Sequence, residues 1–191
     1  MYSLQDITIL ILAGGAGRRV GGEDKGLLDY QGQKLINKQI GWAKKQADNI
    51  IISANRNLSK YQTFGFPVLE DDSKGFPGPL NGVLKALEKC ETPWLFVQPI
   101  DLPNLPENIL NLMFSRKDKL TKCAYLETSS REHYLSMIIH KDCLKELNGY
   151  LTQGHSKVST FHHLIKSQKI NLGLNEKLFL NLNRVGDYLL E

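Results

Sequence analysis

A glycine-rich segment follows the first apolar run of the sequence. Between Gly14 and Gly26 the chain has six glycines, and the same segment carries three cations, Arg18, Arg19 and Lys25. Glycine lets the backbone adopt positive φ angles and approach a ligand closely, and exposed N–H groups in such a loop can cradle phosphate oxygens. Three cations in one glycine loop suit a triphosphate. The segment therefore predicts a triphosphate-binding loop.

Two common phosphate motifs do not fit this loop. The Walker A motif requires Ser or Thr directly after its lysine, whereas Lys25 is followed by Gly26. The dinucleotide fingerprint, counted from Gly15 and Gly17, requires a further glycine where this chain has Val20. A flexible surface loop is the alternative interpretation. We disfavour it because so many glycines would add an entropy cost without a use.

Polar side chains also stand where later apolar runs end. Asn55, Asp71 and Asp101 each follow a predicted strand. Ligands bind beyond the carboxyl ends of parallel strands, so these residues are expected beside the glycine loop. Asp101 suits Mg²⁺, which prefers one or two carboxylates plus substrate phosphates. The acidic run Glu70-Asp71-Asp72 could accept hydrogen bonds from a guanine N1–H and amino group. Turn or helix-capping roles are the alternatives for Asn55, Asp71 and Asp101.

The glycine loop resembles that of a known enzyme family. The run Leu-Ala-Gly-Gly-x-Gly-x-Arg begins at Leu12, and Lys25 lies beyond it. This pattern is similar to that of nucleotidyltransferases acting on sugar phosphates and cofactors. The tighter string Gly-Gly-x-Asp-Lys-Gly-Leu-Leu, which begins at Gly21, resembles the molybdenum cofactor guanylyltransferase family.

Three later motifs continue the resemblance, and two positions depart from it. Pro-Gly-Pro-Leu-x-Gly begins at Pro77, Asp101 is followed by x-Pro, and Phe-x-Asn-x-Asn begins at Phe179. Ser53 stands where the family has Asn, and Arg184 begins a tail where the family has Thr-Pro-Glu-Glu.

The resemblance implies transfer of GMP from GTP to the terminal phosphate of molybdopterin or of the molybdenum cofactor. Pyrophosphate would be released, and Mg²⁺ would be the cofactor, with Asp101 as its ligand. The implied catalytic residues are Lys25, Asp101 and Arg19. The implied nucleotide-binding residues are Leu12, Ala13, Gly14, Gly15, Lys25, Ser53, Asn55, Asp71, Gly78 and Asp101. The implied acceptor-binding residues are Arg19, Gly22, Gly82, Asn181 and Asn183.

Two other functions stay open at this point. One is a related transferase that uses CTP, or a sugar phosphate as acceptor. The other is a protein that binds a nucleotide or cofactor without catalysis. Lys25 and Asp101 argue against the second, because binding alone does not need a metal carboxylate. An unstable pterin product would favour handover to molybdenum-insertion proteins and molybdoenzyme chaperones.

Apolar runs rich in β-branched residues alternate with amphipathic stretches, most regularly in the first half of the chain. Strands are predicted over residues 7–12, 49–54, 67–69, 94–99, 133–139, 169–174 and 178–182. Helices are predicted over residues 34–46, 57–64, 79–90, 141–151 and 156–166. This pattern predicts a single-domain α/β fold, a Rossmann-like three-layer sandwich whose mostly parallel sheet has helices on both faces. Residues 1 to about 105 are expected to bind the nucleotide, and residues from about 106 to 191 the acceptor.

Composition excludes several classes of protein. The 191 residues are 41% hydrophobic and 23% charged, as in globular domains. The run Ile7–Ala13 is too short for a membrane span and lacks a preceding basic stretch, so we expect a cytoplasmic protein without membrane contact. The chain has three cysteines, and their odd number and wide separation predict reduced thiols rather than disulfides or a metal site. The excess of Lys and Arg between Arg116 and Lys169 would attract an anionic ligand or form a solvated surface, and its scattered pattern does not favour nucleic acid.

Overall fold

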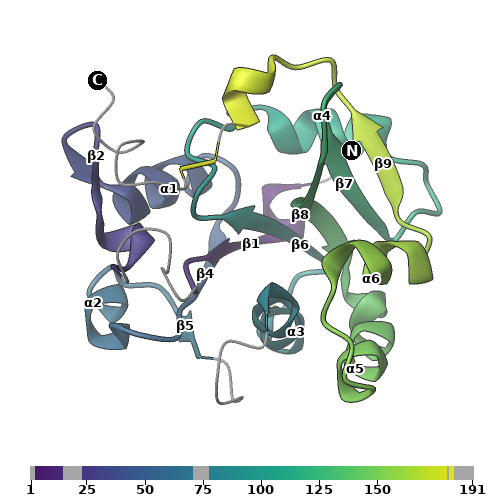
Figure 1. The fold of residues 1–191 in the computed structure, drawn as a ribbon, viewed down its shortest axis with the longest axis horizontal. Helices are drawn as coiled ribbons and strands as arrows, with labels where there is room; N and C mark the ends of the chain where they lie inside the picture. The colour runs from purple at the N-terminus through teal and green to yellow at the C-terminus, as the bar shows by residue number, and fades with distance from the viewer. Residues whose placement is uncertain (1–2, 15–22, 71–77, 180, 183–191) are drawn as a thin grey trace.

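The computed structural model describes residues 3–14, 23–70, 78–179, 181 and 182. Its centre is a seven-stranded sheet with the order β5-β4-β1-β6-β8-β7-β9 (Figure 1). The strands are β1 (Ile7–Leu12), β4 (Asn49–Ser53), β5 (Val68–Leu69), β6 (Trp94–Pro99), β7 (Cys123–Glu127), β8 (Glu132–His140) and β9 (Gln168–Asn171). A small hairpin of β2 (Asp29–Tyr30) and β3 (Gln33–Lys34) forms a second sheet.

The first half of the chain builds the parallel part of the main sheet. β1 pairs in parallel with β4 and β6, and β4 pairs in parallel with β5. Every residue of β1 is buried, as its continuous apolar run requires. Leu12 lies opposite both Ser53 and Pro99, so the carboxyl ends of β1, β4 and β6 meet at one edge of the sheet.

The second half of the chain adds strands that reverse direction. β8 runs antiparallel to both β6 and β7, whereas β9 pairs in parallel with β7. The ladder between β6 and β8 ends where Val97 lies opposite Met137. The first residues of β8 therefore extend past this ladder, on the same edge as the carboxyl ends of the parallel strands.

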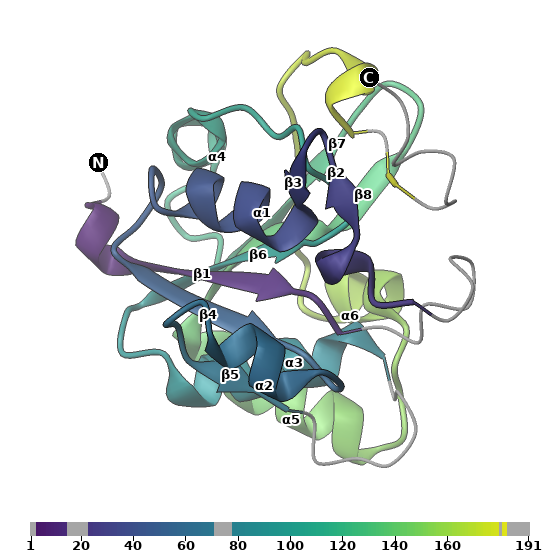
Figure 2. The ribbon, with the colours of Figure 1, turned by 90° about the vertical axis from the view of Figure 1, so that its left-hand side faces the viewer.

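Helices cover both faces of the sheet, as Figures 1 and 2 show. α1 (Leu35–Ala43) and α4 (Ile109–Arg116) pack on one face, and the short α2 (Leu58–Gln62) contributes Tyr61 to the same core. The other face is covered by α3 (Pro79–Lys89), α5 (Leu144–Thr152) and α6 (Val158–Leu164). The predicted three-layer α/β fold with a mostly parallel sheet is confirmed.

The structure departs from the predicted elements at a few places. β7, α4 and the β2–β3 hairpin were not predicted. The predicted strand over residues 178–182 is wrong at its start, because a 3-10 turn, η5 (Glu176–Phe179), occupies it. The predicted helix over residues 141–151 begins with another 3-10 turn, η4 (Lys141–Cys143), before α5. None of the described helices is both long and apolar enough to cross a bilayer.

Candidate active site

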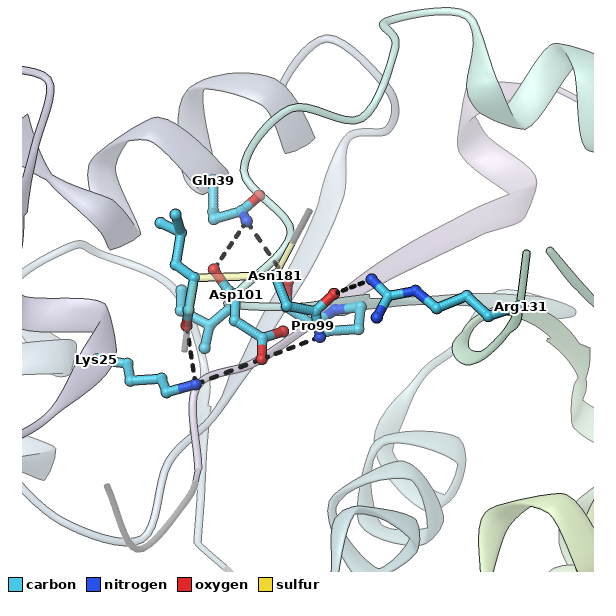
Figure 3. Close-up of polar contacts among 8 residues, drawn as sticks. Lys25, Gln39, Pro99, Asp101, Arg131 and Asn181 are labelled. Atoms are coloured by element: carbon cyan, nitrogen blue, oxygen red, sulfur yellow. Dashed lines mark hydrogen bonds and ion pairs between the residues drawn. The ribbon is translucent and has the colours of Figure 1, made fainter. Parts of the chain in front are cut away.

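Lys25 and Asp101 lie side by side at the carboxyl edge of the parallel strands. Lys25 begins the 3-10 turn η3 (Lys25–Leu27), and its Nζ is 3.4 Å from Asp101 Oδ2 (Figure 3). The same Nζ donates a hydrogen bond to the carbonyl oxygen of Leu182, at 3.0 Å. The two charged side chains are 19% and 21% exposed, so a ligand can reach them although water is partly excluded. Partial exclusion of water strengthens the attraction between these charges and a bound ion.

Asp24 fixes the turn that carries Lys25. Its Oδ1 accepts hydrogen bonds from the Gly26 N–H at 3.2 Å and from the Tyr61 hydroxyl at 2.6 Å. Asn57 Nδ2 donates to Oδ2 at 3.0 Å. Burial and the bond to Asp24 raise the pKa of Tyr61, so its hydroxyl remains a donor. A Cβ on Gly26 would lie 2.4 Å from the Tyr61 oxygen, which explains the glycine at this position.

The C-terminal segment returns to the same place. The Leu182 N–H donates to the Asp101 carbonyl at 3.0 Å, and Asn181 Nδ2 lies 3.5 Å from Asp101 Oδ2. Arg131 Nη2 in turn donates to Asn181 Oδ1 at 3.1 Å (Figure 3). It also donates to the Phe179 carbonyl oxygen at 2.6 Å. Sequence reasoning did not find Arg131. The only sequence signal for it was its membership of the basic stretch in the second half of the chain.

The beginning of the glycine loop is anchored on the neighbouring strand. The N–H groups of Ala13 and Gly14 both donate to the carbonyl oxygen of Ser53, each at 2.9 Å. A Cβ on Gly14 would lie 3.5 Å from Asn55 Nδ2, so these two residues are neighbours at this edge. Asn55 is half-buried, whereas the Ser53 side chain is buried. Four residues predicted to bind the nucleotide, Ala13, Gly14, Ser53 and Asn55, thus lie together.

The first turn of α3 approaches the same edge. Gly78 precedes the helix with a φ of 109°, a conformation that favours glycine. Gly82 is buried, and a Cβ there would lie 2.6 Å from Ser53 Oγ and 3.1 Å from Leu12 Cδ2. Close packing of α3 against β1 and β4 therefore accounts for Gly82, and its predicted contact with the acceptor stays a prediction.

Several predicted site residues lie outside the described residues. They are Gly15, Arg19, Gly22, Asp71 and Asn183. Their predicted roles in nucleotide or acceptor binding therefore stay predictions.

A cavity of about 280 Å³ adjoins Asp101. Its wall includes Arg131, His133, Ser136 and Asn181. Burial, with the nearby Arg131 charge, lowers the pKa of His133 to about 4, so the imidazole is neutral at neutral pH. Ser136 is fully buried, and its Oγ has no hydrogen-bond partner among the described residues. The cavity thus offers neutral polar groups beside the Arg131 cation and the Asp101 and Glu132 carboxylates.

Solved structures of nucleotidyltransferases share this fold. The molybdopterin-guanine dinucleotide biosynthesis protein A from Archaeoglobus fulgidus superimposes with a TM-score of 0.77, covering 95% of each chain at 19% identity. The 4-diphosphocytidyl-2C-methyl-D-erythritol synthase from Anaerococcus prevotii gives a TM-score of 0.73 at 10% identity, covering 97% of this chain and 94% of that chain. These two likenesses show that the chain has the fold of the two solved proteins.

The family follows from the sequence comparisons. Residues 9–168 match the family model described as the MobA-like NTP transferase domain. Molybdenum cofactor guanylyltransferases from Yersinia pestis and Yersinia pseudotuberculosis are 35% identical over 182 residues, which span 95% of this chain and 93% of theirs. The chain therefore belongs to the MobA-like NTP transferase family.

Proposed function

We propose that this chain transfers GMP from GTP to the terminal phosphate of molybdopterin, or of the molybdenum-loaded cofactor, with release of pyrophosphate. The observation that carries the proposal is the 3.4 Å approach of Lys25 Nζ to Asp101 Oδ2 at the carboxyl edge of a MobA-like fold. The guanylyltransferases that are 35% identical to this chain support GTP as the donor and a molybdenum cofactor as the acceptor.

Asp101 is the residue proposed to hold Mg²⁺. No group of three metal-ligating side chains occurs among the described residues. A single carboxylate nevertheless fits Mg²⁺, because this ion takes one or two carboxylates and completes its shell with water and substrate phosphates. When bound, Mg²⁺ would neutralise charge on the triphosphate. Asn181 and Lys25, which both contact Oδ2, would keep this oxygen directed towards the phosphates.

The transfer itself needs no protein base. A terminal phosphate oxygen of the acceptor attacks the α-phosphorus of GTP, an O–P bond forms there, and the bond to the β-phosphate oxygen breaks. Pyrophosphate leaves with the electron pair. Because the acceptor phosphate is ionised near neutral pH, catalysis depends on positioning and on charge neutralisation. We assign charge neutralisation to Lys25, together with Arg19.

The two substrates would lie on opposite sides of Asp101. Ala13, Gly14 and Asn55, at the ends of β1 and β4, are proposed to face the nucleotide. The cavity of about 280 Å³ is proposed to hold the acceptor. Its neutral His133 and the unpaired Ser136 hydroxyl suit a polar, uncharged heterocycle such as a pterin. We further propose that the product passes in the cytoplasm to molybdenum-insertion or molybdoenzyme chaperone proteins.

Pyrophosphate release with each of the four NTPs, in the presence of molybdopterin, tests the proposed function. We expect pyrophosphate release with GTP and with none of the other three NTPs. Release with CTP would instead indicate a cytidylyltransferase, and nucleotide binding without any release would indicate a sensor or carrier.

Variants of the two central residues test the mechanism. Lys25→Ala and Asp101→Ala are each expected to lower kcat by about 10²–10³, as loss of a preorganised charged group does. Lys45→Ala is the matched control, because Lys45 pairs with Glu107 on the exposed surface, at 2.5 Å. Near-normal turnover in both site variants would contradict the mechanism.

A further inference from the structure

Two glutamines are buried in the apolar layer behind Asp101. Gln39 lies on α1 and Gln98 on β6, and each is only 1% exposed. A buried amide destabilises a protein unless its donors and acceptors are paired. The hydrogen bonds of the two amides should therefore explain why glutamines, rather than apolar residues, occupy these two buried positions.

Both amides donate to the backbone on either side of Asp101. Figure 3 shows the Gln39 amide directed at the backbone beside Asp101. Gln39 Nε2 is 3.1 Å from the Ile100 carbonyl oxygen and 3.1 Å from that of Leu102. Gln98 Nε2 donates to the same Leu102 oxygen at 3.0 Å and to Gln39 Oε1 at 3.0 Å. The amide nitrogens must face these atoms because all of them are acceptors.

The backbone here needs such donors. Ile100 and Leu102 are buried and lie just past the end of β6, where their carbonyl groups have left the ladder. Their N–H groups bond to the Leu12 and Pro99 carbonyls, at 3.1 and 3.3 Å. The glutamines satisfy the carbonyl groups. The turn that presents Asp101 is thus held from both sides.

We propose that Gln39 and Gln98 are positioning residues that hold the Asp101 carboxylate towards Lys25 and the phosphates. The proposal rests on the proposed function, because it assigns Asp101 a role in transfer. Gln98 Oε1 has no hydrogen-bond partner among the described residues, which is a destabilising feature. The hydrogen bonds of the pair therefore satisfy the turn around Asp101 while one polar atom of the pair itself stays unpaired, which favours a role in positioning over one in stability alone. Small displacements of reacting groups can lower rates about 10²-fold.

Gln39→Met and Gln98→Met test the proposal, because methionine keeps the shape of the side chain and removes the amide. Gln98→Met also removes the unpaired oxygen, so it is the safer variant for folding. The matched control is Thr8→Val with Thr92→Val. These two hydroxyls form a buried hydrogen bond, 2.7 Å long, at the opposite edge of the same strands.

The first measurement is amide hydrogen exchange at Ile100 and Leu102, which needs no substrate. Exchange is expected to accelerate about tenfold or more in both glutamine variants and to stay unchanged in the threonine control. The second measurement is pyrophosphate release. We expect kcat to fall about 10- to 100-fold, with KM for GTP changed less than about twofold.

Two outcomes separate the proposal from its premise. If the glutamine variants keep wild-type exchange and kcat, and only their melting temperature falls as in the control, the positioning role is overturned. If the wild-type protein releases no pyrophosphate, the proposed function has failed. Exchange at Ile100 and Leu102 then still decides whether the glutamines hold the turn.

Discussion

Arg131 reaches the proposed active site through another residue. Its Nη2 donates to Asn181 Oδ1 and to the Phe179 carbonyl, while Asn181 Nδ2 faces Asp101 Oδ2. Because Arg131 occupies the amide oxygen, it fixes which end of the Asn181 side chain faces the carboxylate. It also holds the backbone that brings the Leu182 carbonyl to Lys25.

Arg131→Met should therefore lower kcat for transfer by about tenfold or more, since a small misplacement of reacting groups is costly. The kcat of Arg131→Lys should lie between those of Arg131→Met and the wild type, because an ammonium keeps the positive charge but not the planar, two-pronged donor geometry of the guanidinium. Arg116→Met, at the exposed end of α4, is the control. Steady-state pyrophosphate release checks the prediction, and an unchanged kcat in Arg131→Met would contradict it.

The sequence could predict Lys25 and Asp101 but not the residues that support them. Lys25 and Asp101 belong to local motifs placed where strands end, so spacing alone suggested their position. Arg131 meets Asn181 across 50 positions, and Gln39 meets Ile100 across 61. Such contacts depend on how strands and helices pack, and no local pattern encodes them.

At the scale of elements, the parallel half of the fold was predicted closely and the other half less so. β1 and β6 have the predicted bounds, because a strand buried on both faces is a nearly continuous apolar run, which only Thr8 and Gln98 interrupt here. β7 has the sequence Cys-Ala-Tyr-Leu-Glu, which lacks β-branched residues. The start of the strand predicted over residues 178–182 is wrong because Asn175 Oδ1 accepts the Lys177 N–H at 2.9 Å, which starts the 3-10 turn η5 instead.

Replacing a helical glycine with alanine should destabilise the protein at one position and stabilise it at two others, because the space around the three glycines differs. Gly82→Ala in α3 should destabilise the protein by about 1–3 kcal/mol, since its Cβ would meet Ser53 Oγ at 2.6 Å. No atom lies within 4 Å of a Cβ built on Gly41 in α1 or on Gly149 in α5. Gly41→Ala and Gly149→Ala should each stabilise it by about 0.5–1 kcal/mol, because alanine is the better helix former.

Urea unfolding of the three variants measures these differences. Adding Ser53→Ala to Gly82→Ala removes the closest clashing atom, so the double variant should regain part of the lost stability. A Gly82→Ala protein as stable as wild type would show that α3 moves away from β4 freely. The close packing inferred for this edge would then be wrong.

At the scale of the whole molecule, the two halves of the sheet meet at the candidate site. The parallel strands supply Asp101 and the turn of Lys25, and the first residues of β8 supply the wall of the cavity. The C-terminal segment crosses between them, as the bonds of Asn181 and Leu182 show. The separation into a nucleotide-binding half up to about residue 105 and an acceptor-binding half beyond it stays a prediction.

In the second half of the molecule, a buried histidine connects α6 with β8. His162 on α6 is 2% exposed, and its Nε2 lies 2.9 Å from the Tyr134 carbonyl oxygen on β8. A carbonyl only accepts, so Nε2 carries the proton, and Nδ1 accepts from the Ser167 hydroxyl at 2.8 Å. Burial lowers the pKa of His162 to about 4. The folded protein therefore keeps this imidazole neutral, whereas the unfolded chain protonates it near its usual value of about 6.5.

The whole fold should lose stability as pH falls through this range. Between about pH 6.5 and about pH 4 the unfolded chain binds a proton that the folded state excludes, so the free energy of unfolding falls with pH. For His162 alone, the free energy of unfolding falls by about 2 kcal/mol between about pH 7 and about pH 5.

His162→Gln tests this prediction, because glutamine cannot titrate. Between the same two pH values its free energy of unfolding, measured in urea, should fall by about 2 kcal/mol less than that of the wild type. His163→Gln is the control for the substitution itself, because the neighbouring side chain is exposed. Equal losses in wild type and His162→Gln would contradict the prediction, because they would mean that His162 accepts a proton in the folded state as readily as in the unfolded chain.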